Sequence, residues 1–179
     1  MFEPTALKTT RQAVEMAKEK GAIIAIDTNI RPLRWSSEEI CRETISSFFE
    51  DANILKLTDE ELFFLTKTTT LEEGLAALDQ LLVPIVLVTV GANGTYAVLN
   101  GEVMHVGVEK VQAVDTTGAG DAFMAGVLRY VHYKGLPTTP EDLRKCVAFG
   151  NKLGALAATK AGALTALPCY DDIKHLIED

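Results

Sequence analysis

Short apolar runs alternate with stretches of helical spacing along the chain, and this alternation constrains the fold more than any other feature. Three runs have the length and composition of buried strands, at residues 22–27, 53–57 and 84–90. Helical spacing or capping residues precede and separate them, at 5–20, from Ser36 through Phe49, from Thr58 to Leu65 and at 71–82. Strand, helix, strand in repetition is typical of an α/β protein with a mainly parallel sheet.

The second half begins with a different local pattern. Residues 95–99 and 103–108 predict two strands joined at Asn100-Gly101, a dipeptide that favours a tight hairpin. Helices are then expected at 119–133 and 140–160, with a short final helix at 170–177. Asp27, Lys56, Thr89 and Asp115 fall at or just after the ends of expected strands. Ligands of such sheets bind at the carboxyl ends of strands, so these four residues are predicted to meet at one edge.

The most unusual segment is Asp115-Thr116-Thr117-Gly118-Ala119-Gly120-Asp121, which leads into the helix expected at 119–133. A helix start carries unpaired N–H groups and the positive end of the peptide dipoles, so it suits an anion. Glycines let the backbone approach a phosphate closely, and the Asp121 carboxylate is placed to accept a proton from a nearby hydroxyl. Ordinary capping is the alternative, but capping needs neither a second acid nor paired glycines. The combination indicates phosphoryl transfer to an alcohol.

Composition limits the classes of protein to which the chain can belong. Its 179 residues suffice for one domain, and its net charge of -8 argues against nucleic acid or an anionic membrane as the main partner. The longest apolar run is too short to span a bilayer. Cys41, Cys146 and Cys169 are widely spaced, which indicates reduced thiols in a cytoplasmic protein rather than a disulfide framework or a zinc site.

Two familiar phosphate-binding motifs are excluded. The sequence has no G-x-x-x-x-G-K-[ST], so it is not a P-loop protein. Phe123 stands where a dinucleotide fingerprint needs a third small residue after Gly118 and Gly120.

Five ordered segments resemble the ribokinase/PfkB family of carbohydrate kinases, and its fructokinase branch in particular. The catalytic signature lies at 115–123 and the D-P-N-x-R segment at 27–31. The K-x-S-D-E-E segment lies at 56–61, the T-x-G-x-x-G nucleotide loop at 89–94 and the closing segments at 149–168. The resemblance implies a ribokinase-like three-layer α/β/α fold with a mainly parallel sheet. It also implies ATP and Mg²⁺ as cofactors, with K⁺ in those members that use a monovalent cation, and a small sugar as the acceptor.

The resemblance assigns catalytic roles residue by residue. Asp121 is similar to the base that takes the proton of the sugar hydroxyl, and the amides of Gly118, Ala119 and Gly120 resemble the anion hole for the transferred phosphoryl group. Thr89, Gly91 and Gly94 resemble part of the nucleotide loop, although a plain strand-to-hairpin turn would use the same residues.

Several further roles have structural alternatives. Asn151 resembles an adenine-site residue, but an Asn on a helix of small residues is also a common packing contact. Lys56 and Glu61 resemble residues that place the nucleotide phosphates and the water shell of Mg²⁺, or they are an ordinary strand-end Lys and first-turn Glu. Arg31 resembles a residue on the phosphate or sugar side, with a surface ion pair as its alternative. Asp115 and Thr117 resemble monovalent-cation ligands, with helix capping as the preferred alternative.

The chain departs from the family pattern in sequence and in length. Thr28 stands for the usual Pro, Thr58 for Ser or Asn, and Gly150 for a common Ala. The 179 residues resemble only the C-terminal, nucleotide-binding and catalytic part, as a single domain without the N-terminal strands and the β lid. Expected partners are therefore ATP, a sugar, and either a second copy of the chain or the missing N-terminal half.

The primary hypothesis is an ATP-dependent fructokinase-type sugar kinase. The alternatives are a kinase for another substrate of the family, such as 2-dehydro-3-deoxygluconate or ribose, and a truncated, non-catalytic nucleotide-binding module.

Overall fold

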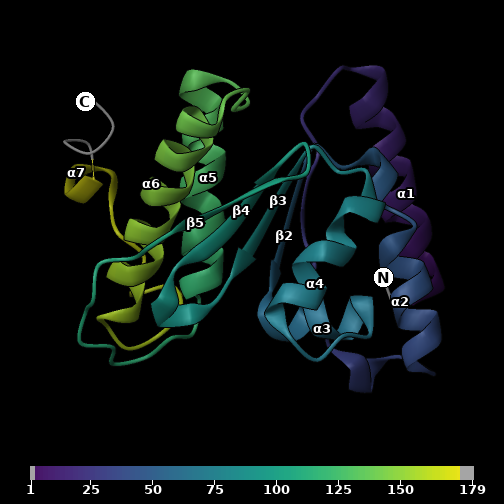
Figure 1. Cartoon of the computed structure of the whole chain (residues 1–179), viewed down its shortest axis with the longest axis horizontal. Coiled ribbons are helices and arrows are strands. Elements are labelled where there is room, and N and C mark those ends of the chain that lie inside the picture. The colour runs from purple at the N-terminus through teal and green to yellow at the C-terminus, as the bar shows by residue number, and fades with distance from the viewer. Residues whose placement is uncertain (1–2, 174–179) are drawn as a thin grey trace. The chain divides into compact units, whose positions relative to one another are not determined.

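The computed structural model describes residues 3–173 of the chain (Figure 1). It is an α/β fold with a five-stranded sheet in the order β1-β2-β3-β4-β5. The strands are β1 Ala25–Asp27, β2 Ile54–Thr58, β3 Ile85–Thr89, β4 Thr95–Leu99 and β5 Glu102–Val106. The α-helices are α1 Pro4–Glu19, α2 Glu38–Ser46, α3 Asp59–Thr66, α4 Leu71–Ala77, α5 Ala119–Lys134, α6 Pro140–Ala158 and α7 Tyr170–Ile173. Residues 174–177 of the expected last helix lie outside the described residues.

The chain divides into two compact units, and each is described by itself. One comprises residues 1–88 with 100–103, and the other comprises residues 89–99 with 104–179. The first unit carries β1, β2 and nearly all of β3 together with α1 to α4. The second carries β4, most of β5 and α5 to α7.

In the first unit, strand pairing and helix capping agree with the sequence. β1 and β2 are parallel, with Asp27 opposite Lys56. Thr58 and Glu61 form a reciprocal capping box at the start of α3, and the Ser37 hydroxyl accepts a hydrogen bond from the Ile40 amide at the start of α2. The core contains the apolar residues of β2 and β3 with Ile45, Phe48, Phe49 and Leu62.

Three expectations for the first unit need correction. β1 has only three residues, and all are half-buried rather than buried. Helix α2 ends at Ser46, so the buried Phe48 and Phe49 lie beyond it, and Ile40 is 47% exposed. The helix expected at 71–82 is α4 followed by a 3-10 turn, Leu78–Leu81. The ends of these helices depend on which side chains pack in the core. The local spacing of apolar residues does not specify those ends.

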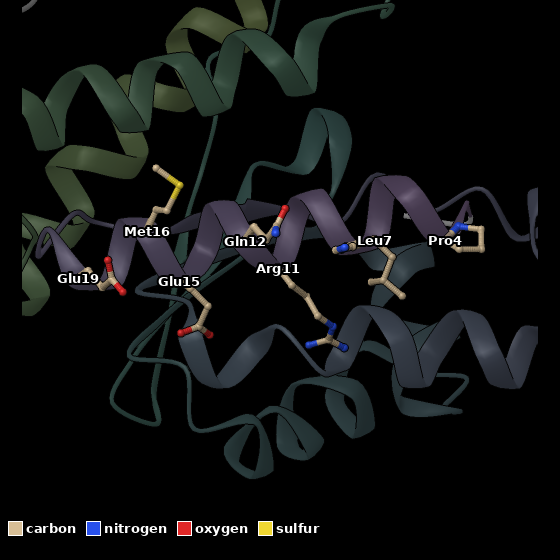
Figure 2. Close-up of a pocket in the computed structure, with 8 residues that line it drawn as sticks. Pro4, Leu7, Arg11, Gln12, Glu15, Met16 and Glu19 are labelled. Atoms are coloured by element: carbon tan, nitrogen blue, oxygen red, sulfur yellow. The ribbon is translucent and has the colours of Figure 1, made fainter.

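Helix α1 has no buried residue among the described side chains. Its polar contacts are with the segment after α2, because the Arg11 guanidinium donates to the Ser47 hydroxyl over 2.9 Å and Lys18 forms an ion pair with Asp51. An open hollow lies along this helix, lined by Leu7, Glu15, Met16 and neighbouring residues (Figure 2). Figure 2 shows Arg11 and Glu15 on one side of the helix and Met16 on the other.

In the second unit, α5 and α6 pack against each other side by side, and α6 packs on β4 (Figure 1). Glycine makes the helix contact close, since a Cβ at Gly126 would lie 3.0 Å from the Cα of Gly150. Asn100 and Gly101 both have positive φ, as a tight turn between β4 and β5 requires. No helix among residues 3–173 is long and apolar enough to cross a bilayer.

Candidate active site

The Gly118–Asp121 segment forms the start of α5. Gly118 adopts φ +80, and a Cβ there would lie 3.2 Å from the Cα of Ala163, so this position suits only glycine. The segment around Ala163, which resembles the family's closing motif, therefore lies against the catalytic signature. No side chain caps this helix start, and the Asp121 carboxylate lies on an exposed residue in its first turn.

The three amides predicted for an anion hole are not equivalent. The Ala119 N–H donates to the Thr116 carbonyl over 3.1 Å and thus has a partner within the loop. No side chain caps the start of α5. The remaining amides and the helix dipole are therefore the groups that would attract an anion there. Of the three amides predicted for the anion hole, that of Ala119 is the one bonded inside the loop among the described residues.

Asp115 is a structural residue of the loop that precedes α5. Its carboxylate accepts hydrogen bonds from the Thr117 amide and from the Gly162 amide, each over 2.9 Å. The hydrogen bond of the Thr117 side chain, then that of the Gly162 amide, lower the pKa of Asp115 to about 2. Asp115 does not follow a strand end as expected, because β5 ends at Val106 and a loop intervenes. The amides of Val114 and Asp115 instead bond to the Ala158 carbonyl at the end of α6.

The nucleotide-loop residues form a tight turn between β3 and β4. Gly91 has φ +56, and the Val90 amide donates to the Gly94 carbonyl over 2.9 Å. Gly94 has φ +93, and a Cβ there would lie 2.3 Å from the Val106 carbonyl oxygen. The backbone of β5 therefore excludes any side chain at Gly94. Thr89 is half-buried at the end of β3.

The Asn151 side chain holds α6 to the hairpin. Its amide oxygen accepts a hydrogen bond from the Thr95 hydroxyl over 2.6 Å. Its Nδ2 donates to the carbonyls of Val106 and Gly107 over 3.0 and 3.2 Å. Both amide hydrogens and the amide oxygen are thus used inside the protein, which favours the packing role over an adenine contact.

In the first unit, two of the predicted site residues, Lys56 and Glu61, are buried and bonded within the protein. Lys56 is 5% exposed and its Nζ lies 3.1 Å from the Asp27 carboxylate. The Glu61 carboxylate accepts hydrogen bonds from the Thr28 hydroxyl and the amides of Ile30 and Thr58, over 2.9, 2.6 and 2.9 Å. These contacts favour the structural alternatives for Lys56 and Glu61. Arg31 is exposed, and its guanidinium donates to the Ile30 carbonyl.

Thr28, which stands where the family usually has proline, bonds to two of the predicted site residues. Its amide donates to the Lys56 carbonyl over 3.1 Å and its hydroxyl donates to Glu61. A proline, usual in the resembling family, could make neither bond. The pairing of Thr28 with a buried acid 33 positions away has no local signal in the sequence.

The described residues hold no cluster of three or more His, Cys, Asp or Glu side chains suited to a metal ion. Cys41, Cys146 and Cys169 form no disulfide bond among the described residues, and burial raises the pKa of Cys146 to about 12. Asp27 and Lys56 meet as the strand-end pattern predicts. That Thr89 and Asp115 join them stays a prediction.

The chain matches the pfkB family carbohydrate kinase over residues 2–169, and it belongs to that family. It is 39% identical over 168 residues to a fructokinase of Klebsiella pneumoniae, a match that covers 93% of this chain and 55% of the relative. The chain thus spans about half the length of the curated relatives it matches.

Solved structures of fructokinases share the fold. The enzyme from Vibrio cholerae O395, in a form with fructose, ADP and calcium ion bound, superposes with a TM-score of 0.90 at 33% identity, covering 98% of this chain and 57% of that one. A fructokinase from Xylella fastidiosa with bound ATP gives a TM-score of 0.87 at 28% identity, covering 99% and 58%. The resemblance to a ribokinase-like carbohydrate kinase is confirmed.

Alanine substitutions in the glycine turn test its geometry. Gly94→Ala is expected to cost about 2–4 kcal/mol of unfolding free energy, since the new Cβ meets backbone that cannot yield locally. Gly91→Ala adds only left-handed strain in open space, about 1–2 kcal/mol. Gly107→Ala, also in open space, is the control and should stay within about 0.5 kcal/mol. Urea unfolding of the three variants gives the order, and equal costs would contradict the proposed contact.

The Asn151 network predicts a second stability effect. Asn151→Ala leaves the buried Thr95 hydroxyl and two carbonyls without their partner, and it should cost about 2–4 kcal/mol. Lys152→Ala, at the next and exposed position of the same helix, is the matched control with a change near zero. A double-mutant cycle with Thr95→Val should show coupling above about 0.5 kcal/mol. Additive costs would show that the two side chains do not interact.

Asp115 predicts a pH dependence of stability. Its pKa in the folded protein, about 2, lies below the ordinary value of 3.8, so its carboxylate stabilises the fold above the ordinary value. This contribution is lost as the pH falls from the ordinary value towards the folded one. Asp115→Asn should therefore destabilise the protein most near neutral pH, with a difference from the wild type that shrinks in acid. Urea unfolding across this range measures it, with Glu109→Gln as the control for loss of one charge from the same loop.

Proposed function

We propose that the protein is an ATP-dependent sugar kinase of the fructokinase type, or the nucleotide-binding and catalytic part of one. The observation that carries the proposal is the uncapped start of α5, where Gly118 and the exposed Asp121 keep the pattern of the family's catalytic signature. Fructokinases are its relatives in sequence and in fold, and their structures hold fructose, ADP or ATP. This supports ATP and fructose as the two substrates.

The proposed reaction needs a base and a place for negative charge. The Asp121 carboxylate accepts the proton of a sugar hydroxyl, whose oxygen attacks the γ-phosphorus as the bond to ADP breaks. The amides of Gly118 and Gly120 and the dipole of α5 stabilise the charge on the transferred group. The exposed position of Asp121 gives the hydroxyl direct access to the base.

A divalent metal bound to the nucleotide would supply charge neutralisation at the phosphates. Mg²⁺ in kinases is held by phosphate oxygens, water and one or two carboxylates, so the lack of a three-residue cluster among the described residues fits it. Within this proposal, Glu61 acts through water, because its oxygens already accept three protein hydrogen bonds. Asp115 and Thr117 close the loop rather than bind K⁺, since the carboxylate is taken up by two amides.

The remaining roles follow the same contacts. We place Thr89, Gly91 and Gly94 at the nucleotide, Arg31 towards the phosphate or sugar, and Lys56 and Asn151 behind the site as supports. The buried free thiols of Cys41 and Cys146 suit a reducing compartment, so we place the protein in the cytoplasm.

Phosphoryl transfer from ATP to fructose, followed by ADP release, tests the function. Asp121→Ala should lower the rate by about 10²–10⁴-fold and leave ATP binding intact, because the base acts only in the transition state. Glu141→Gln, which removes an exposed acid elsewhere in the second unit, is the control and should keep full activity.

The assay is run on the chain alone and on the chain joined to the part of a fructokinase relative that it does not match. Transfer to ribose or 2-dehydro-3-deoxygluconate instead of fructose would reassign the substrate. ATP binding without transfer in either form would favour the non-catalytic module, and activity unchanged by Asp121→Ala would remove Asp121 as the base.

A further inference from the structure

A second cavity lies in the α5–α6 hairpin, within the second unit. It has a volume of about 680 Å³ and is bounded by the last turns of α5, the connection that follows and the first half of α6. This volume falls in the range of small-molecule sites. Its walls carry four cationic side chains, three aromatic rings and a single acid, namely Arg129, Lys134, Lys145 and Lys152, Tyr130, Tyr133 and Phe149, and Asp142.

The charge of this cavity is opposite to that of the protein. The chain has a net charge of -8, with 17 basic and 25 acidic residues, yet four basic side chains and one acid line the cavity. A concave site lined by one sign of charge concentrates ions of the other sign. The nearby acid Glu141 lies 3.7 Å from Lys145, but both side chains are more than 60% exposed, so water screens this pair.

Some side chains that line the cavity are held in place by contacts within the protein. The Arg129 guanidinium lies over the Tyr133 ring, 4.4 Å from its centroid, which restricts both side chains. Asp142 is engaged at the start of α6, where it accepts a hydrogen bond from the Thr139 hydroxyl over 2.9 Å. The Phe149 and Tyr130 rings are half-buried and offer apolar surface beside the cationic groups.

We propose that this cavity binds a small organic phosphate of the hexose phosphate kind, at a site separate from Gly118–Asp121. Lysine and arginine pair with phosphate oxygens through charge-assisted hydrogen bonds. The aromatic rings bury the apolar face of a sugar ring, and the tyrosine hydroxyls bond to its hydroxyl groups. Neither α5's first turn nor the glycine turn lines the cavity, so binding here does not rest on the proposed kinase activity.

Calorimetric titration of the 179-residue chain with fructose 6-phosphate, inorganic phosphate and fructose tests the site. At the cavity, fructose 6-phosphate should bind saturably, inorganic phosphate more weakly, and fructose weakest of the three. The double variant Lys145→Gln, Lys152→Gln should bind fructose 6-phosphate at least about tenfold more weakly, or about 1.4 kcal/mol. Both side chains are exposed, so the variant is expected to fold, and far-UV circular dichroism checks this. The double variant Lys8→Gln, Lys20→Gln, at two exposed lysines of the first unit, is the charge-matched control with unchanged affinity.

Further binding measurements distinguish this site from the proposed nucleotide site. Asp121→Ala and saturating ATP should leave fructose 6-phosphate binding unchanged, and amide NMR shifts on titration should fall on α5 and α6 near the cavity. Equal affinity in the double variant and the wild type would overturn the proposal. So would displacement of fructose 6-phosphate by ATP, or shifts of the α5 and α6 amides near the cavity with fructose alone at as low a concentration as with its phosphate. Absence of phosphoryl transfer by the wild-type protein, alone and joined to the unmatched part of a relative, with this binding intact would contradict the proposed function and not this site.

Discussion

The hydrogen-bonded side chain of Asn151 is the constraint on which the second unit depends. One buried amide, 7% exposed, joins β4 through Thr95 and the end of β5 through two backbone carbonyls. Helix α6 is thereby set against the hairpin, and α5 packs on α6. The segment predicted to be catalytic begins α5, so its place relative to the glycine turn follows from this polar contact. Buried polar groups act in this way only when all their bonds are made.

Glu61 has a comparable role in the first unit. Its carboxylate joins the residues after β1, the end of β2 and the start of α3 through bonds to Thr28, Ile30 and Thr58. The Thr28 hydroxyl supplies one of these bonds in place of the proline usual in the family. The two units thus share one principle, in which a single buried polar side chain fixes several backbone segments. Glu61 and Asn151, two residues with expected roles towards the nucleotide, each make several hydrogen bonds within the protein.

The glycines and the acidic residues around the start of α5 have different structural roles. Glycines at 94 and 118 permit close backbone contacts, with Val106 and with Ala163, that any side chain would prevent. The carboxylate of Asp115 closes the loop before α5, and Asp121 is left exposed at its start. Together they form a hydrogen-bonded frame with the exposed acid Asp121 beside it, an arrangement suited to a base that must receive a hydroxyl. The cationic cavity between α5 and α6 lies outside this frame and is independent of it.

The sequence by itself determined the α/β class, the hairpin at Asn100-Gly101, the capping box at Thr58 and the family, because these depend on local spacing and on a long contiguous motif. Tertiary structure decided where helices end, as at Ser46, and which polar side chains are hydrogen-bonded within the protein. The Ala119 amide, Asn151 and Glu61 matched a functional pattern in sequence, yet each is bonded within the protein. The Ala119 amide bonds to Thr116, only three positions away. Distant partners set the bonds of Asn151 and most of those of Glu61, such as Asn151 with Thr95 across 56 positions. No local pattern records them, because hydrogen bonding of a buried group depends on what surrounds it in space.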